Sequence, residues 1–501
     1  MDYRIFFPTS RKDFDTRMRT GQRYRYAFGD FRLAQRHTDL LERLSEKGTS
    51  VIHQLSYERK DIVGAYRFVD NEKVGLGELI YQTSRIAESQ IRDKDLQVNL
   101  DRSSFSLQLG GYSRGDWADE VGVLEDNRTA GFYLTPSLVL ERASQHCLGL
   151  GDALLHTRPK SSLSPKENAK ARAQRAKLPL AHKESGAWAI VASNTALQLQ
   201  AARRVTFVMD QGGDCYEVLQ HILDEVKRNF IVRVKNDREA TLTATGVSGK
   251  FSELLASQPW SDVRSVFIRA LDHYSKSSGK RVKRKKRKAK LAIRFIEVTL
   301  ARPSSLPKHQ PSISQPLTLV EVMEMADTVP QGEEPVHWRL LCSWATGGVQ
   351  AAWAVVQAYQ GRWHIEQLFR CCKKQGLDVE CSQLRSSDSI MKLTIMALKA
   401  SAEALRLTQV RDGEEFVPID DMFDEHKQQL LEKLNAKLSG RTEKVTNPHR
   451  TDSLAWAAWV IARLGGWKGY ASQRKPGPVT MARGLTRFND LAFWMEEAFN
   501  P

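Results

Sequence analysis

The stretch YQGRWHIEQLFRCCK, residues 359–373, has the periodicity of a helix with two unlike faces. At roughly 100° per residue, one face of about 60° collects a phenol, a carboxylate and two cations: Tyr359, Arg362, Glu366 and Lys373. The opposite face is apolar and predicts a core stripe, with the last residue nearer its edge: Ile365, Leu368, Cys372 and Phe369. Taken alone, the pattern fits either an ordinary surface helix with a glutamate–arginine pair or a functional carboxylate flanked by cations.

The composition is that of an ordinary globular protein. The chain has 501 residues, of which 41% are hydrophobic and 27% charged, and this length allows roughly two to four domains. We find no apolar stretch long enough for a membrane span or a signal peptide, so we expect a cytoplasmic protein without a membrane partner. The six cysteines match no zinc spacing, and we expect reduced thiols that hold no structural metal.

The charge favours a polyanionic partner. The formal net charge is +16, and nine of the eleven residues in KRVKRKKRKAK, 280–290, are Lys or Arg. Such a run is typical of a solvated, mobile segment. It also fits a loop that binds nucleic-acid phosphates without reading sequence, in which case binding depends on salt.

The order of predicted elements indicates an α/β protein with helical ends. Residues 1–80 are basic and helical, and residues 95–157 form three strand-like runs that predict an antiparallel meander. A polar, basic loop or surface insertion follows at 157–183. A helix, a buried strand, a Gly-containing turn and another helix come next, before β-rich sequence at 230–345. Residues after 400 are mainly helical.

Two aspartates follow strand-like segments. Asp101 comes after LQVNL and Asp210 after RRVTFVM, positions where open α/β sheets place ligands. An aspartate after a strand is most often a turn former or a helix cap. Together with Glu366, however, these residues supply three carboxylates from three distant segments. Such a set suits phosphodiester chemistry, in which two Mg²⁺ ions about 3.5–4 Å apart activate the attacking oxygen and stabilise the leaving one. Arg362 and Lys373 would then hold phosphate oxygens.

The spacing of the opening stretch resembles a known signature. Tyr359, Arg362, Glu366 and Lys373 match the Y-x2-R-x3-E-x6-K pattern of the DDE transposases of bacterial cut-and-paste insertion sequences, in the insertion-sequence-four family and the group that contains the Tn-five transposase. Further blocks of the chain match in order: GAYRFVDN, LDRSSFSL, KESGAW, FVMDQGGD, FIVRVK, HWRLL and SLAWAAWVIARLGGW. Several ordered blocks are more specific than one motif, so they favour the functional interpretation of the helix.

The resemblance implies a domain plan and a metal site. It implies a helical domain at 1–80 that binds the transposon end, an RNase H-like catalytic domain at 81–400 with a β-rich insertion at about 238–345, and a helical domain at 401–501 for dimerisation and DNA contact. It implies Asp101, Asp210 and Glu366 as catalytic ligands of two Mg²⁺ ions, for which Mn²⁺ is expected to substitute.

The resemblance also implies DNA contacts. Members of the group cut through a DNA hairpin, and Trp338 and Trp363 match tryptophans that accommodate a flipped base, for which an apolar ring face is suited. Without the resemblance, either tryptophan is equally well explained as a core residue. Further matches to phosphate contacts are Arg32, Arg233 and Lys235, with Tyr359, Arg362 and Lys373 beside the carboxylates. Strand alternation puts Arg233 and Lys235 on one face, which also fits a merely solvated strand face.

The leading hypothesis is therefore a transposase that binds the terminal inverted repeats of its element as a synaptic homodimer. It would cut by metal-dependent hydrolysis and hairpin formation and join the 3′ ends to target DNA. We expect a bacterial, nucleoid-associated protein without a nucleotide cofactor, because no phosphate-cradling Gly-rich loop is evident. The alternatives are a catalytically silent DNA-binding regulator derived from a transposase and, third, a standalone RNase H-like nuclease. The turn after Asp210 and the basic stretch 157–182 depart from the group, so DNA contacts there are not transferred.

Overall fold

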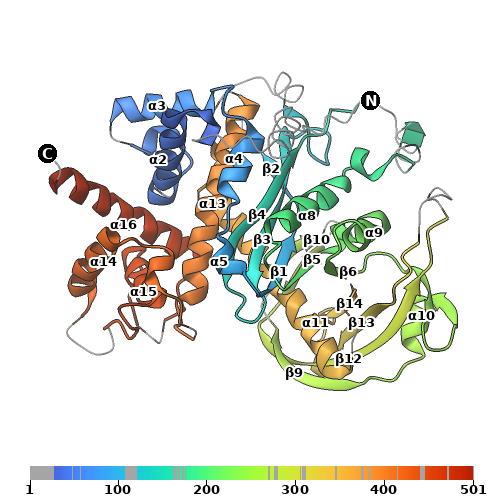
Figure 1. Cartoon of the computed structure of the whole chain (residues 1–501). Helices are drawn as coiled ribbons and strands as arrows, with labels where there is room; N and C mark the ends of the chain where they lie inside the picture. The colour runs from blue at the N-terminus through green and yellow to red at the C-terminus, as the bar shows by residue number, and fades with distance from the viewer. Residues whose placement is uncertain are drawn as a thin grey trace. The chain divides into compact units, whose positions relative to one another are not determined.

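The chain forms two compact units in the computed structural model. The first holds Met1–Glu167, Asn194–Arg203 and Trp363–Pro501, and the second holds Asn168–Ser193 and Arg204–Arg362. Figure 1 colours the chain from blue to red along these segments. The structure describes residues 27–47, 49–56, 58–107, 121–161, 166–167, 170–171, 174, 177–268, 271–275, 280–304, 306, 312–344, 347–373, 377–382, 384, 386–414, 416–440, 446–470 and 473–499.

The sheet of the first unit contains the predicted meander. Strand β3 (Gly131–Glu141) pairs antiparallel with β1 (Asp95–Leu100), with β2 (Ser103–Ser106) and with β4 (Cys147–His156). The prediction of three antiparallel segments is confirmed, with the first of them divided into β1 and β2. Both long strands, β3 and β4, are almost wholly buried, which explains their continuous apolar sequence.

The break between β1 and β2 has a cause on the neighbouring strand. The register continues across it, since Leu100 pairs with Ser137 and Ser103 with Leu134. This register places Asp101 opposite Pro136. Proline has no N–H to donate to a strand ladder, so regular pairing is weakened there. Asp101 therefore stands at an interruption of a buried sheet.

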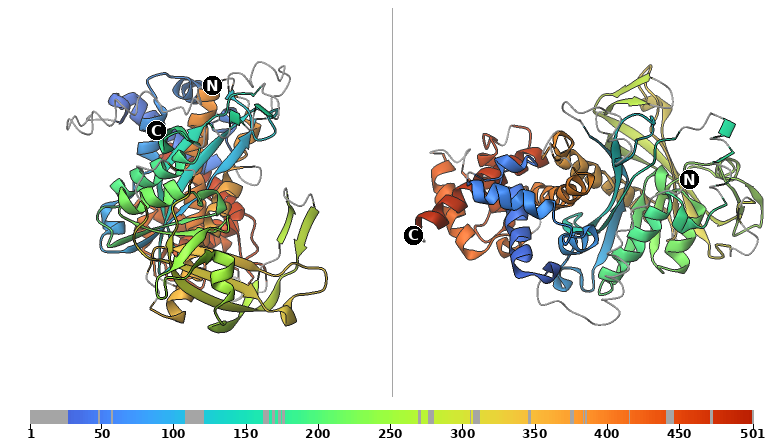
Figure 2. Two further views of the ribbon diagram at one scale, coloured as in Figure 1. Left: turned by 90° about the vertical axis from the view of Figure 1, so that its right-hand side faces the viewer. Right: turned by 90° about the horizontal axis from the view of Figure 1, so that it is seen from above.

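Helices from both ends of the chain pack together in the first unit. Its amino-terminal helices are α2 (Phe31–Lys47), α3 (Arg59–Val69), α4 (Leu76–Thr83) and α5 (Glu88–Ile91). The later ones are α12 (Trp363–Cys372), α13 (Ser387–Val410), α14 (Glu425–Leu438), α15 (Leu454–Leu464) and α16 (Pro478–Phe499). Helix α13 packs against α2, α3, α4, α12, α15, α16 and strand β4, and α16 also packs against α2. Figures 1 and 2 show the blue helices beside the orange and red ones.

One buried lysine joins the two ends of the chain. Lys392 of α13 is 1% exposed, and its ammonium donates hydrogen bonds to the carbonyl oxygens of Val69 (3.1 Å) and Asn71 (3.0 Å). It also pairs with Asp388 at 2.5 Å. Val69 is the last residue of α3, where carbonyl groups lack partners within the helix. Lys392 thus caps α3 from a distant part of the sequence.

The second unit is β-rich, as predicted for 230–345. Its strands are hydrogen-bonded in the order β5 (Arg204–Met209), β6 (Asn229–Arg233), β14 (His337–Cys342), β13 (Leu317–Glu324), β12 (Arg287–Leu300), β7 (Glu239–Leu242) and β8 (Ser248–Lys250), and β9 (Asp262–Ile268) also pairs with β12. Strands β5 and β6 run parallel, and the other pairs with assigned register are antiparallel. The helices include α9 (Tyr216–Asp224), α10 (Phe251–Ala256) and α11 (Val349–Gly361). The predicted sequence of helix, strand, turn and helix is confirmed by α8 (Gly186–Gln198), β5 and α9.

The basic run 280–290 is not a loop, which corrects the prediction. Its residues belong to β11 (Lys280–Arg284), which pairs with β10 (Leu271–Ser275), to the start of β12, and to the two-residue connection between these strands, Lys285 and Lys286. Arg287 forms ion pairs with Glu324 and, at 3.3 Å, with Glu333. Burial raises the pKa of the Glu324 carboxyl, but hydrogen bonds from Arg287, the Val336 N–H and Thr328, together with the charge of Arg287, outweigh this and the pKa is lowered. Arg287 is therefore a structural cation, whereas the lysines on either side of it are exposed.

The opening stretch is divided into two helices, which corrects the prediction of one. Helix α11 ends at Gly361, Arg362 forms its C-cap, and α12 begins at Trp363. The boundary between the two units falls at the same place. The predicted core stripe of α12 is confirmed, because Ile365, Leu368 and Cys372 are fully buried and Phe369 is 7% exposed.

Two predicted segments lie partly outside the described residues. Residues 1–26 are not described, and the predicted helices of the amino-terminal region are confirmed for α2 and α3. Much of the polar stretch 157–183 is not described either, although short helical pieces are described at 166–167 and 170–171. Across the described part of the chain, no helix has the length and apolarity needed to span a bilayer.

Candidate active site and DNA-binding region

The first unit places Asp101 and Glu366 on neighbouring elements. Asp101 is half-buried after β1, where its carboxylate accepts a hydrogen bond from the Arg102 N–H at 2.8 Å. Glu366 is half-buried in the first turn of α12, and α12 packs against β1. Both side chains are therefore positioned by the same strand and helix.

Lys373 ties the end of α12 to the strand that follows Asp101. Its ammonium donates to Ser103 Oγ at 2.8 Å and to the Ser104 carbonyl oxygen, and it lies 4.6 Å from the centre of the Phe105 ring. Burial lowers the pKa of Lys373, and nearby Glu380 opposes this effect. Lys373 therefore has a structural role in addition to the predicted phosphate contact.

The second unit gathers four of the predicted residues around Tyr359. Asp210 follows β5, and the parallel register of Met209 with Val232 puts it beside Arg233 on β6. Tyr359, on α11, is 6% exposed, and its ring meets that of Trp338 edge-on at 5.5 Å. Burial raises the pKa of Tyr359, Arg362 and Arg233 lower it, and Asp210 raises it, so these groups are close enough to interact. Arg362 lies 5.8 Å from the ring centre.

Asp210 caps a short helical turn, as aspartates after strands commonly do. Its Oδ1 accepts a hydrogen bond from the Gly212 N–H at 2.8 Å at the start of a short helical turn, Gln211–Gly213. A Cβ at Gly212 would lie 2.9 Å from this oxygen, so glycine permits the close approach. Among the described residues Oδ2 of Asp210 accepts no hydrogen bond, which leaves one carboxylate oxygen for another ligand.

Lys235 and Trp363 are both exposed. Lys235 follows β6, and its N–H donates to buried Asp214 at 2.7 Å while its side chain is exposed. Val234 is buried, whereas Arg233 on one side of it is half-buried and Lys235 on the other is exposed, in keeping with the predicted alternation. Trp363 is 36% exposed at the start of α12, so it is not a core residue.

The donor chemistry of the three carboxylates suits Mg²⁺, which prefers carboxylate oxygens. In the described part of the chain, however, no three His, Cys, Asp or Glu side chains form a group that fits a metal ion. Two of the predicted ligands, Asp101 and Glu366, belong to the first unit, and Asp210 belongs to the second. The set of three therefore stays a prediction.

Sequence reasoning missed an arginine pair beside Asp101. Arg102 and Arg158 lie 5.2 and 4.6 Å from the centre of the Tyr133 ring, and Arg158 donates to the Tyr133 hydroxyl at 2.9 Å. Cation–π contacts of this kind hold guanidinium groups in place. Since Arg102 and Arg158 come from different strand ends, no local spacing could reveal that they share one aromatic ring.

Exposed basic and aromatic residues follow one helix near the amino terminus. Helix α3 buries Ala65, Phe68 and Val69, and it exposes the following residues: Arg59, Lys60, Val63, Tyr66 and Arg67. Asp61, on the inner side, pairs with Arg36 at 3.4 Å and with Arg43 at 2.8 Å, which fixes α3 on α2. Arg32 in the first turn of α2 has an 89% exposed side chain, 3.6 Å from Asp30. This surface is suited to phosphates and base edges.

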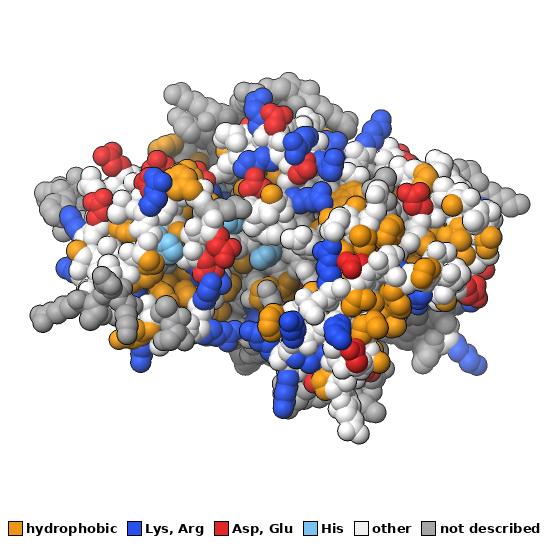
Figure 3. All heavy atoms as spheres, turned by 90° about the horizontal axis from the view of Figure 1, so that it is seen from below, with side chains coloured by type: hydrophobic (Ala, Val, Ile, Leu, Met, Phe, Trp, Pro, Cys, Tyr) orange, Lys and Arg blue, Asp and Glu red, His pale blue; other side chains and the backbone are white. Residues whose placement is uncertain are grey.

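A family comparison identifies this region. Residues 24–74 match the model of the transposase DNA-binding family. The match supports a transposase that binds DNA. It covers α2 and α3, so exposed Arg32 and the outer face of α3 belong to a DNA-binding region. The charge agrees with this function, because Lys and Arg residues outnumber Asp and Glu in the sequence. Figure 3 shows Lys and Arg side chains spread over the face seen from below, which is not the face of α2 and α3.

The DNA-binding region contains a buried histidine. His37 of α2 is 6% exposed and packs at 5.3 Å from Phe28 and 6.2 Å from Phe68, measured between ring centres. Burial lowers the pKa of His37 to about 4. The folded region therefore holds the neutral ring, whereas the unfolded chain takes up a proton near pH 6.5.

Acid is expected to destabilise this region through His37. The unfolded state binds more protons between pH 6.5 and about 4, so stability is fully present above pH 6.5 and is lost as the pH falls. The expected loss is about 3 kcal/mol at about pH 4. Urea denaturation between about pH 7 and 4.5 measures it. His37→Leu should flatten this slope, and His182→Leu, at an exposed histidine, should not. Equal slopes for wild type and His37→Leu would contradict the assignment.

Proposed function

We propose that this protein is a DDE transposase that excises and inserts a DNA element. The match of residues 24–74 to the transposase DNA-binding family carries the proposal. The sequence signature supplies the finer assignment, because Tyr359, Arg362, Glu366 and Lys373 fit the pattern of the insertion-sequence-four family and its Tn-five group. The large mixed sheet and its covering helices are compatible with an RNase H-like core.

The carboxylates would bind the catalytic ions. Asp101 and Glu366 from the first unit and Asp210 from the second would hold two Mg²⁺ ions, which supply Lewis-acid activation of water and of a 3′ hydroxyl. The open Oδ2 of Asp210 and the half-buried positions of the other two support this role.

The residues around Tyr359 would position DNA. Arg233 and Arg362 carry positive charge beside Asp210 and are suited to phosphate oxygens, and Tyr359 orients Arg362 by a hydrogen bond. Half-buried Trp338, packed on Tyr359, offers a ring face to a flipped base. A hairpin intermediate requires such a site, since the strand must bend sharply at the cut.

The test is cleavage of a duplex that carries the inverted repeats flanking the gene. With Mg²⁺, and not with EDTA, the protein should release a fragment with hairpin ends, and two subunits should occupy each pair of ends. Tight, end-specific binding without cleavage under either condition would overturn the catalytic proposal and favour a DNA-binding regulator.

Removal of the Trp338 ring is expected to slow hairpin formation more than the first nick. Base stacking on an aromatic ring contributes about 1–3 kcal/mol, so we expect roughly a 5- to 150-fold slower hairpin step for Trp338→Ala. Quenched-flow assays with end-labelled DNA separate the two steps. Trp338→Phe should recover part of the rate, and Trp260→Ala, elsewhere in the same unit, should change neither step. Equal slowing of both steps would exclude base stacking at Trp338.

A further inference from the structure

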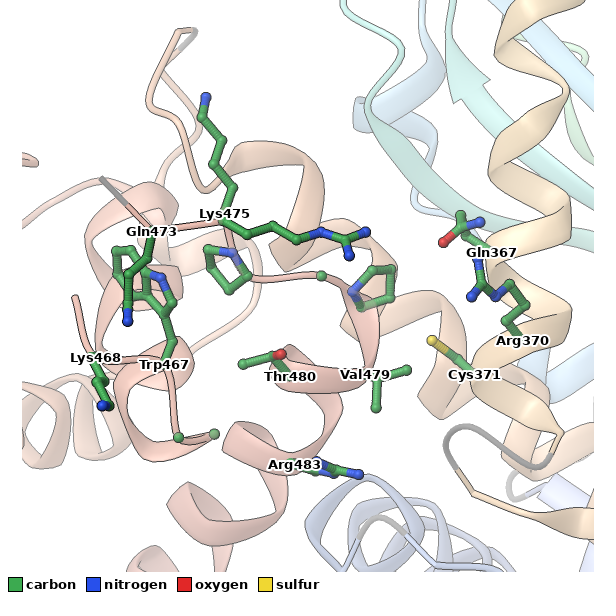
Figure 4. A pocket seen from close by; sticks show the side chains of 16 residues that line it. Gln367, Arg370, Cys371, Trp467, Lys468, Gln473, Lys475, Val479, Thr480 and Arg483 are labelled. Carbon is green, nitrogen blue, oxygen red and sulfur yellow. The ribbon is translucent and has the colours of Figure 1, made fainter. Parts of the chain in front are cut away.

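A cavity of about 610 Å³ lies in the first unit beside α12 and α16. Gln367, Arg370 and Cys371 of α12 form one wall, and the segment that leads from α15 into α16 forms the rest (Figure 4). Its volume lies within the range of small-ligand sites.

The wall of the cavity is strongly basic. Among the sixteen described residues that line it, five are Lys or Arg and none is Asp or Glu. Lys475 is neutralised by Asp412 at 2.9 Å. Within the described parts of the chain, Lys468, Arg474 and Arg483 form no ion pair with a carboxylate, and all three are exposed. Cations from three places along the chain thus face one hollow without a protein counter-charge.

One further feature of the wall points to a ligand. The amino end of α16, a 22-residue helix that starts at Pro478, lies in the wall. Helix amino ends attract anions.

We propose that this cavity binds the phosphate of a nucleotide. Several unpaired cations and a helix amino end together suit the oxygens of a phosphate better than a single carboxylate or chloride. The half-buried ring of Trp467 and the ring of Pro476 also line the cavity and give it an apolar surface for a base. The nucleotide is either a free one or a residue of a DNA strand.

The test compares binding of two probes. ADP represents the free nucleotide, and a random duplex of about 20 base pairs represents the DNA backbone. Dissociation constants are measured by calorimetry and by fluorescence anisotropy for the wild type, for Arg474→Gln combined with Arg483→Gln, and for Lys433→Gln. Lys433 is an exposed cation of α14 outside the cavity, so Lys433→Gln is the single-charge control for Arg474→Gln. Lys433→Gln combined with Lys437→Gln, also exposed on α14, is the charge-matched control for the double variant. Arg474→Gln alone serves if the double variant melts at a lower temperature.

We expect the double variant to bind one probe with an affinity lower by roughly tenfold or more. Lys433→Gln, alone or combined with Lys437→Gln, should bind both probes with the wild-type affinity. Loss of ADP binding alone identifies a free nucleotide. Loss of duplex binding identifies the DNA backbone as the ligand. In that case the slope of log affinity against log salt concentration should fall by the equivalent of about two phosphate contacts. Equal affinities of wild type and double variant for both probes, or no binding of either probe to the wild type, would overturn the proposal. Because no cleavage is measured, the outcome is independent of the proposed catalytic activity.

Discussion

Replacement of Glu366 by glutamine is expected to abolish strand cleavage and to leave binding of the transposon ends unchanged. The amide keeps the size of the side chain in the first turn of α12 and removes the negative charge that would hold a metal ion. Loss of such a ligand is expected to reduce the cleavage rate by roughly a thousandfold or more, or about 4 kcal/mol in the activation free energy. The apolar stripe of α12 is untouched, so the melting temperature should stay the same.

Asp210→Asn, a change in the second unit, is also expected to abolish strand cleavage and to leave binding of the transposon ends unchanged. The amide oxygen can still accept the hydrogen bond from the Gly212 N–H, so the turn after β5 should persist. Cleavage is followed on end-labelled duplex with Mg²⁺, and binding by a mobility-shift assay. The controls are Glu432→Gln on α14 and Asp224→Asn at the end of α9, both at exposed positions. Undiminished cleavage by either site variant would exclude that residue as a metal ligand.

Lys392→Met is expected to cause the largest loss of stability. The change removes the charged donor from the carbonyl oxygens of buried Val69 and half-buried Asn71, although the Ser389 hydroxyl still donates to the Val69 oxygen at 3.2 Å. Asp388 is half exposed, so the main cost is the loss of a charged donor to these acceptors, about 1–3 kcal/mol. Because those carbonyls lie at the end of α3, the helices of the DNA-binding region should lose their attachment to α13 first.

Urea denaturation and hydrogen exchange measure this effect. Amides in residues 59–83 should exchange faster in the variant than in the wild type, and binding of the transposon ends should weaken in parallel. Lys399→Met is the matched control, since this lysine is a half-exposed residue of the same helix. If both substitutions change the free energy of unfolding equally, the buried contact is not responsible.

The sequence predicted the elements whose pattern is local. Apolar runs identified β3, β4, β5 and β6, and helical periodicity identified α2, α3 and the buried face of α12. Prediction failed where a distant partner decides the structure. The run 280–290 forms strands because β12 pairs with β9 and β13 and because Glu324 and Glu333 neutralise Arg287. No pattern within these eleven residues, nine of them basic, contains that information.

The placement of the candidate site residues was predictable in part for the same reason. Asp101 and Asp210 directly follow strands, as expected from the sequence. The structure groups Arg233, Trp338, Tyr359 and Arg362 in one unit with Asp210, and the roles of these residues stay predictions. The division of the signature helix at Arg362 was not predictable, because its residues have uniform helical periodicity. The cation–π pair on Tyr133 and the basic cavity are formed by segments that are remote in sequence.

The cap that Lys392 places on α3 has a consequence for synthesis on the ribosome. Asn71 and Lys392 are 321 residues apart. At about 5–20 residues per second, the amino-terminal helices emerge roughly 15 to 60 s before α13. During that interval the nascent chain already displays the basic face of α3, and the helices that complete its packing do not yet exist. Newly made chains therefore pass through a stage in which the DNA-binding region is accessible and incompletely anchored.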